Sequence, residues 1–217
     1  MRNVLAEFVG TSTLAAVVVG SGIMAQNLTT DVGVQLLINA AATGAALWLL
    51  ITLFAPISGA HFNPVVTGIS LYRKELSLKN AFQFLLSQVL GAIVGTIFAN
   101  VLFDNSAINI SSKNRDGGNI LLSEVFATAG LVFLIYQLST IKKGKSVAVG
   151  VAAWIFGAYF FTSSTSFANP AISIGRIFSN TFAGIAPHSA FTFIPFQIVG
   201  AIIGYALFNY FNKKVKK

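Results

Sequence analysis

The chain has 217 residues, of which 55% are hydrophobic and only 9% are charged, and its formal net charge is +8. A soluble globular domain carries roughly 25% charged residues. This chain therefore has too few charges to cover a surface that faces water, and a lipid bilayer is its expected surrounding. The absence of cysteine excludes disulfides and thiolate metal sites. The positive charge does not indicate nucleic acid as a partner, because the basic residues stand at the ends of apolar runs.

Six apolar stretches are long enough to cross roughly 30 Å of hydrocarbon at about 20 residues each. We expect the first to be a retained span and not a cleaved signal peptide, because Glu7 lies near its start and no Ala-x-Ala site follows. Two further apolar pieces, 63–71 and 169–179, are too short to span, and both begin with Asn-Pro. The six predicted spans are 4–24, 34–54, 81–103, 121–141, 147–167 and 190–211.

The distribution of Lys and Arg predicts the orientation of the spans. Six spans place eleven of the fourteen basic residues on one side of the membrane, and the other side holds only Lys113, Arg115 and Arg176. We therefore expect both termini in the cytoplasm and the chain in the inner (plasma) membrane. The polar loop 104–119 then lies on the outer side and joins two halves.

The two halves, about 1–103 and 120–217, resemble each other. The third and sixth spans share Gln, then Gly-Ala-Ile, then Gly at one spacing, in Q-V-L-G-A-I-V-G from Gln88 and Q-I-V-G-A-I-I-G from Gln197. The first and fourth spans carry Glu7 and Glu124 in similar contexts. Three spans per half is an odd number, so the halves are inverted relative to each other, as in many membrane transport proteins.

The two Asn-Pro segments then enter the membrane from opposite faces. Proline suits the first position of a helix and asparagine is a good N-cap, so each segment is predicted to be a short re-entrant helix. Non-helical backbone at membrane depth is tolerated where it lines an aqueous cavity. Two positive helix ends, each equivalent to roughly +0.5 charge, would repel cations there and favour neutral solutes that accept hydrogen bonds. The alternative is that each asparagine is only an N-cap.

S-G-A-H-F-N-P-V-V-T from Ser58 and F-A-N-P-A from Phe167 resemble the two signature loops of the aquaporin and glycerol-facilitator (major intrinsic protein) family. The resemblance covers essentially the whole chain. It implies an all-α membrane fold of six tilted spans and two half-helices, one channel domain over 1–217, and a homotetramer with one pore per subunit. Val65 departs from the usual alanine and is expected to add two methyl groups beside the pore. The motif residues are Asn63, Pro64, Val65, Asn169, Pro170 and Ala171.

The same resemblance implies a four-residue selectivity filter, found by spacing from the two asparagines. These positions are Thr43, Gly157, Ser166 and Ile172. Water-selective members are similar in having an aromatic residue, a histidine, a small residue and an arginine there, and glycerol facilitators have two aromatics, glycine and arginine. Thr, Gly, Ser and Ile imply a wide, weakly polar opening without the usual arginine.

Four further residues have a functional and a structural interpretation each. Glu7 and Glu124 would be costly inside the membrane unless paired, and we expect them to support the re-entrant loops and not to relay protons. His61 is expected to line the pore, the alternative being a packed, hydrogen-bonded histidine. Arg176, roughly 6 Å beyond Ile172 along a helix, either hangs in the outer vestibule or pairs with a loop carbonyl or a lipid headgroup.

The sequence therefore predicts a passive channel for water and small uncharged solutes, with no enzymatic activity, cofactor or metal. Short bacterial aquaglyceroporin-like channels of arsenic-resistance systems are similar in having an apolar residue at the filter arginine and an N-T-F-A-G-I-x-P run like that from Asn180. This resemblance implies glycerol-like polyols or metalloid hydroxides, such as arsenite and methylated arsenicals, as solutes. The alternatives are a strict water channel, a coupled secondary transporter and an adhesive membrane protein with a closed pore.

Overall fold

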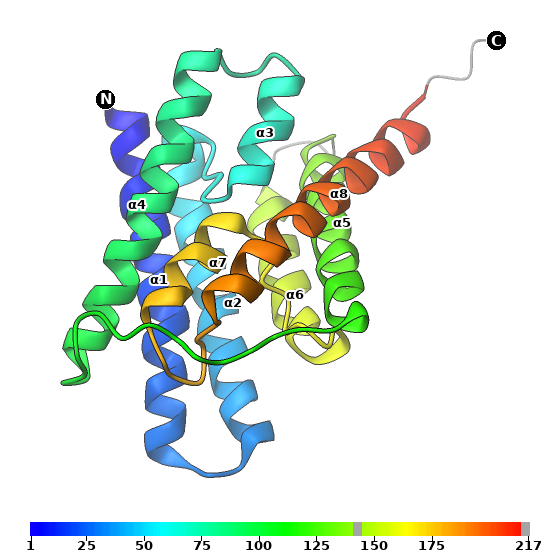
Figure 1. Cartoon of the computed structure of the whole chain (residues 1–217). Helices are drawn as coiled ribbons and strands as arrows, with labels where there is room; N and C mark the ends of the chain where they lie inside the picture. The colour runs from blue at the N-terminus through cyan, green and yellow to red at the C-terminus, as the bar shows by residue number, and fades with distance from the viewer. Residues whose placement is uncertain (141–144, 214–217) are drawn as a thin grey trace.

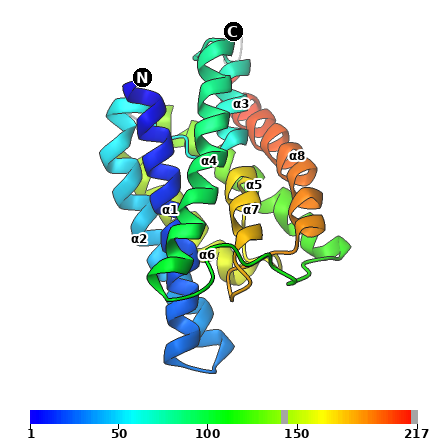
Figure 2. The same cartoon turned by 60° about the vertical axis from the view of Figure 1, so that its left-hand side comes forward.

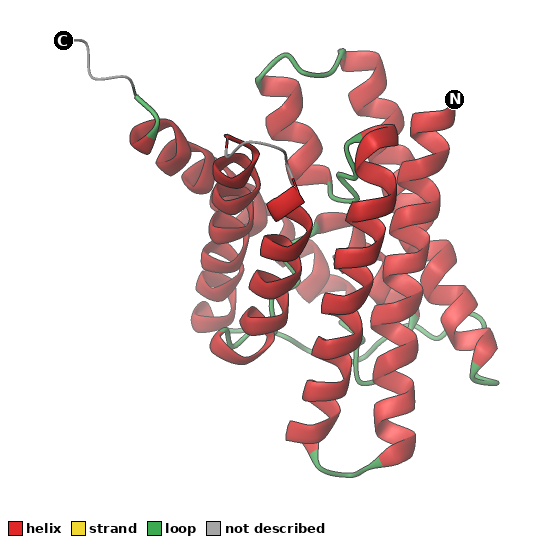
Figure 3. Ribbon diagram, turned by 180° about the vertical axis from the view of Figure 1, so that it is seen from behind, coloured by secondary structure: helices red, strands yellow, loops and turns green. Residues whose placement is uncertain are grey.

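The computed structural model describes residues 1–140 and 145–213, and these ranges contain helices and loops without any strand (Figures 1 and 3). Within them, α1, α2, α4, α5 and α8 are long and apolar enough to cross a membrane, and the apolar part of α6, Ser146–Phe161, is shorter. The helices in chain order are α1 (Arg2–Leu28), α2 (Val32–Ser58), α3 (Pro64–Tyr72), α4 (Leu78–Leu102), α5 (Gly118–Thr140), α6 (Lys145–Phe161), α7 (Pro170–Gly175), the 3₁₀ turn η1 (Arg176–Phe178) and α8 (Pro187–Phe211).

The order of long and short helices is the same in the two halves of the chain. Helix α1 packs on α4 as α5 packs on α8, and α2 meets α6 between the halves. The short helices α3 and α7 point toward each other inside the bundle (Figures 1 and 2). The predicted all-α fold of six apolar helices and two half-helices is confirmed.

The fifth span is shorter than the sequence predicted. It was expected over 147–167, but α6 ends at Phe161 and the chain continues as a loop to Asn169. Thr165, Ser166 and Ala168 have φ angles of 61°, 51° and 47°, which no α-helix accommodates. The predicted end of the fourth span, Ile141, lies outside the described residues.

Glycines set the closest contacts between long helices. A Cβ atom on Gly95 of α4 would overlap the carbonyl oxygen of Ser12 on α1, and one on Gly204 of α8 would overlap that of Ala129 on α5. Small residues allow helix backbones to approach this closely in lipid. The shared Gly-containing sequence of α4 and α8 thus packs each against the first helix of its own half.

Candidate functional site

Glu7 holds the loop that precedes α3. Its side chain is fully buried, and its Oε1 accepts hydrogen bonds from the Ser58 hydroxyl at 2.6 Å and the His61 N–H at 2.9 Å. Its Oε2 accepts from the Phe62 N–H at 2.7 Å and from the Gln88 side-chain amide at 2.8 Å. Four donors therefore satisfy one carboxylate, which is the arrangement that lets a charge stay buried.

Glu124 holds the loop that precedes α7 in the same way. It is also fully buried, and it accepts from the N–H groups of Phe167 and Ala168, both at 2.9 Å, and from the Gln197 amide at 2.7 Å. The two loops carry left-handed backbone at matching positions, three residues and one residue before each asparagine. Such backbone is strained for residues other than glycine, and the glutamate hydrogen bonds hold it in place.

The two asparagines start the half-helices and also tie the loops together. Asn63 Oδ1 accepts from the Val65 N–H at 3.1 Å, and Asn169 Oδ1 accepts from the Ala171 N–H at 3.0 Å. Asn63 Nδ2 donates to the Ala168 carbonyl and Asn169 Nδ2 donates to the Phe62 carbonyl, each at 2.8 Å. An amide carries two N–H donors, and within the described residues each asparagine uses one of them across the loop contact and has no protein acceptor for the other.

A cavity of about 350 Å³ runs past these asparagines between the two halves of the chain. Seven of the fourteen candidate residues line it, and they come from α2, from both loops, from α7 and from η1. Those that line the cavity are Thr43, His61, Asn63, Ser166, Asn169, Ile172 and Arg176.

Gly157, Val65 and Ala171 are not among the residues that line this cavity. A Cβ on Gly157 would meet the Phe161 ring of its own helix. Ala171 is fully buried in the protein core, and Val65 packs with Tyr136 and Phe208 in a separate apolar cluster. The structure therefore does not bring the extra methyl groups of Val65 to the cavity wall.

Tyr159 lines the cavity on α6 and was not singled out from the sequence. Only 3% of its surface is exposed, and its hydroxyl lies 3.1 Å from Thr43 Oγ1. A tyrosine inside an apolar span needs a hydrogen-bond partner for its hydroxyl. That requirement was a signal for Tyr159, but the sequence did not identify the partner on α2.

Arg176 does not hang freely in a vestibule, since only 2% of its surface is exposed. Its Nε donates to the Ala183 carbonyl, and its guanidinium carbon lies 3.5 Å from the centre of the Phe167 ring. The expected alternative, pairing with a loop carbonyl, is what the structure shows. The same side chain also lines the cavity.

Arg115 brings a second guanidinium to the same region from the loop between α4 and α5. Its Nε donates to the Gly184 carbonyl at 3.1 Å, and its guanidinium carbon lies 5.0 Å from the centre of the Phe167 ring. Burial lowers the pKa of Arg115 to about 10, while Tyr159 and Glu124 act in the opposite sense. Arg115 is therefore still a cation at neutral pH.

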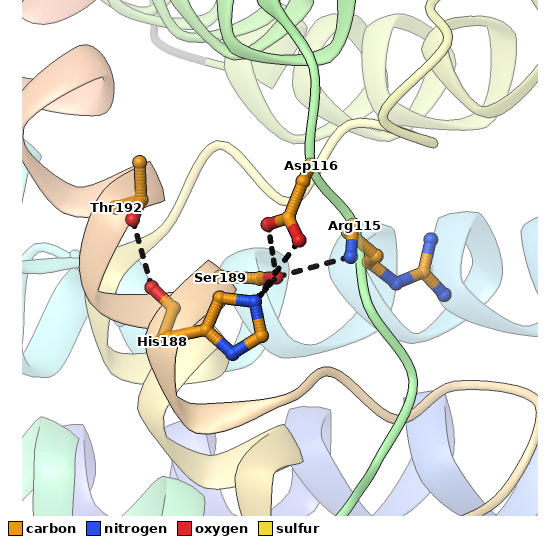
Figure 4. Close-up of polar contacts among 5 residues, drawn as sticks. All are labelled: Arg115, Asp116, His188, Ser189 and Thr192. Atoms are coloured by element: carbon orange, nitrogen blue, oxygen red, sulfur yellow. Dashed lines mark hydrogen bonds and ion pairs between the residues drawn. The ribbon is translucent and has the colours of Figure 1, made fainter.

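The first turn of α8 anchors this loop (Figure 4). Ser189 Oγ accepts from the Arg115 N–H at 3.0 Å and donates to Asp116 Oδ1 at 2.6 Å. His188 Nε2 lies 3.0 Å from Asp116 Oδ2. The hydrogen bonds from Ser189 and then His188 hold the pKa of Asp116 below its usual range. Asp116 is therefore ionised at neutral pH and accepts both hydrogen bonds there.

At the other end of the cavity lie His61 and an aromatic cluster. His61 Nδ1 is 3.0 Å from Thr67 Oγ1, so this histidine is hydrogen-bonded as well as cavity-lining. Arg73 pairs with Glu75 at 2.6 Å and lies 4.8 Å from the centre of the Tyr136 ring. In the described part of the chain, no group of three or more His, Asp or Glu side chains could hold a metal ion.

Two half-helices that meet at a cavity between membrane-length helices are the arrangement of a membrane channel. The family model for major intrinsic proteins matches residues 1–162. The match ends before the second Asn-Pro segment. The chain is 42% identical to the aquaglyceroporin AqpS of Rhizobium meliloti over 209 residues, which is 96% of this chain and 89% of that protein. The chain belongs to the major intrinsic protein family.

More distant relatives agree with this assignment. Aquaporin-2 of Rattus norvegicus is 28% identical over 225 residues, covering 96% of this chain and 78% of that protein. Among solved structures, the aquaglyceroporin from Plasmodium falciparum matches with a TM-score of 0.71 and 22% identity, covering 99% of this chain and 96% of that one. At that identity the structural match shows the fold alone.

Proposed function

We propose that this protein is a passive channel that passes water and small uncharged solutes of about the size of glycerol. The observation that carries the proposal is the cavity between α3 and α7, with Asn63 and Asn169 on its wall and one free amide donor on each. The positive ends of both half-helices face this point and repel cations. Neutral solutes with hydroxyl groups fit both features.

The solute class extends to metalloid hydroxides, such as arsenite and methylated arsenicals. A neutral metalloid hydroxide presents the same hydrogen-bonding hydroxyls as glycerol. The relative with 42% identity is named an aquaglyceroporin, which supports solutes larger than water. We propose that Thr43, Ser166 and Ile172, which line the cavity, belong to the filter region, with Gly157 beside it on α6, and that the apolar Ile172 in place of an arginine widens it.

A coupled secondary transporter is the second candidate, and the acidic residues argue against it. Glu7 accepts four hydrogen bonds and Glu124 accepts three, and neither lines the cavity. Among the six acidic residues, all of which are described, only Glu75 lines the cavity, and it is paired with Arg73. No carboxylate is therefore free beside the asparagines to carry a coupling proton.

The test is stopped-flow light scattering on proteoliposomes with water, glycerol, arsenite and methylarsenate. We expect fast, non-saturating flux of the solutes that are uncharged at neutral pH, namely water, glycerol and arsenite, above that of protein-free liposomes. Saturable uptake that depends on an ion gradient would instead establish the transporter. A strict water channel would pass water and none of the other solutes.

The variant Ile172→Arg tests the filter assignment. It adds a bulky cation to the cavity wall, so flux of the larger solutes should fall about tenfold or more while water still passes. Ile172→Leu is the matched control, because it keeps an apolar side chain of similar volume. If Ile172→Arg left large-solute flux unchanged, Ile172 would not belong to the filter.

A further inference from the structure

The cavity wall carries an arginine, Arg176, that lies outside the four filter positions implied by the family resemblance. The filter position reached by counting from Asn169 is the apolar Ile172, yet Arg176 lines the same cavity with only 2% of its surface exposed. Four residues of helix correspond to about 6 Å of rise. The cation therefore lies about one turn farther from the asparagines than the resemblance implies.

The surroundings of Arg176 fix its position without a carboxylate partner. Helix α7 ends at Gly175, where a Cβ atom would come within 2.8 Å of the Ala92 carbonyl group on α4, so the backbones are in direct contact. The chain then turns into η1, which starts at Arg176. The Ala183 carbonyl accepts from Nε, and the Phe167 ring covers the guanidinium carbon at 3.5 Å.

The terminal nitrogens of Arg176 are free to bind a solute. Within residues 1–140 and 145–213, only Nε of this guanidinium has a protein acceptor. The two Nη atoms are not among the buried atoms that lack a partner, so they reach open space. A guanidinium carries five N–H donors in a planar fork, which suits an oxygen acceptor.

Tyr159 is displaced in the same direction as Arg176. It lies two residues beyond Gly157 on α6, or about 3 Å of helical rise away from the asparagines. Its hydroxyl is held by Thr43 at 3.1 Å, and it lines the same cavity as Arg176. A phenol from α6 and a guanidinium from η1 thus line one cavity.

We propose that Arg176 and Tyr159 form the specificity-determining constriction of this channel, displaced away from the asparagine pair relative to Gly157 and Ile172. The inference rests on the proposed channel function and refines it. Arg176, with Arg115 near the same Phe167 ring, repels protonated and cationic species and donates hydrogen bonds to solute oxygens. Tyr159 supplies an aromatic wall and an oriented hydroxyl. The favoured solutes are small uncharged molecules rich in hydroxyl oxygen.

Three variants in proteoliposomes test the proposal against a matched control. Arg176→Gln removes the charge, Arg176→Lys keeps it, and Tyr159→Phe removes only the hydroxyl. Arg2→Gln is the control, because it removes one exposed arginine that does not line the cavity. Proton leak is followed with an entrapped pH dye, and the ratio of five-carbon polyol flux to glycerol flux by light scattering.

We expect Arg176→Gln to raise the proton leak about tenfold or more over Arg2→Gln and to raise the polyol ratio, because a charge near a low-dielectric pore wall is weakly screened. Arg176→Lys should keep the leak low. Tyr159→Phe should change the polyol ratio several-fold without a proton leak.

Three results would overturn the inference in distinguishable ways. If the parent protein passes no water or glycerol, the channel function fails and this constriction fails with it. If the parent conducts but Arg176→Gln matches Arg2→Gln in both measurements, only the constriction is wrong. If Arg176→Gln does not fold, Tyr159→Phe decides, and an unchanged polyol ratio in that variant refutes the proposal.

Discussion

At the scale of single residues, the buried glutamates explain how two strained loops persist inside a membrane. Each carboxylate accepts from two successive backbone N–H groups and from a glutamine amide, Gln88 for Glu7 and Gln197 for Glu124. Hydrogen bonds to a charged group contribute about 1.5 to 3 kcal/mol each. Together they offset the cost of burying a charge and the cost of the left-handed backbone. The asparagines that follow are therefore held in place at the start of each half-helix.

Replacing Glu124 by Gln should destabilise the protein by roughly 2 to 3 kcal/mol, because an amide has only one acceptor oxygen and turns an N–H₂ group toward a backbone N–H. Glu75→Gln is the matched control, since the Glu75 side chain is 45% exposed in its ion pair and such pairs contribute little. Thermal unfolding in detergent measures both. Equal losses in the two variants would contradict the role of Glu124 as a support of the loop.

The role of a residue could be predicted from the sequence where the same residue type occupies the matching position in both halves of the chain. Glu7 with Glu124, Gln88 with Gln197 and Asn63 with Asn169 are matched pairs, and a structural role is the simplest reason for symmetry. Tyr159 and Arg176 have no counterparts of this kind. Their contact with the cavity depends on how α6 is rotated and on the change from α-helix to 3₁₀ turn at Arg176, and spacing along the chain determines neither.

At the scale of elements, the spans were predictable because hydropathy and length constrain a membrane helix strongly. The predicted spans 4–24 and 34–54 lie inside α1 and α2. The predicted bounds of the fifth span were wrong because a standard span length was assumed. Helix α6 ends before the polar run T-S-S-T-S of 162–166. Phe167 and Ala168 donate to Glu124, which lies on α5. Such contacts with a distant helix cannot be predicted from the local sequence of the loop.

The packing of α4 on α1 predicts the effect of adding a single methyl group. Gly95→Ala would place its Cβ against the Ser12 carbonyl oxygen, and a backbone atom cannot move aside as a flexible side chain can. Overpacking of this kind costs about 1 to 3 kcal/mol, so we expect a clear loss of thermal stability in detergent.

Gly68→Ala is the matched control for that variant. Gly68 lies inside α3, and nothing stands within 4 Å of the position that its Cβ would take. Alanine is the better helix former by roughly 0.5 to 1 kcal/mol, so this variant should be neutral or slightly stabilised. The packing argument fails if Gly95→Ala is as stable as Gly68→Ala.

At the scale of the whole molecule, the outer surface carries large apolar side chains on several of the long helices. Trp48, Leu53, Phe98 and Phe126 are each more than half exposed in the single chain. Hydrocarbon and a neighbouring subunit are equally apolar, so this surface alone does not distinguish lipid contact from subunit contact. The homotetramer that the resemblance implies stays a prediction, which native mass spectrometry from lipid nanodiscs can check.

The orientation in the membrane is a prediction that the cysteine-free sequence makes simple to test. The start of α1 and the end of α8 lie at one end of the bundle, and the loop between α4 and α5 crosses the opposite end (Figure 1). Basic residues are retained on the cytoplasmic side, which places Lys74 and Lys213 inside and Ser112 outside. Lys142, Lys143, Lys214, Lys216 and Lys217 contribute to this prediction but lie outside the described residues.

A single introduced cysteine shows on which side of the membrane its position lies, because the parent chain has no cysteine that could also be labelled. Ser112→Cys should react with a membrane-impermeant maleimide in spheroplasts with an intact inner membrane, since Ser112 is exposed in the loop. Lys74→Cys and Lys213→Cys, also at exposed positions, should react only after the membrane is opened. Labelling of all three in sealed spheroplasts would mean mixed insertion. The reverse pattern would place both termini outside, and the constriction formed by Arg176 and Tyr159 would then face the cytoplasm.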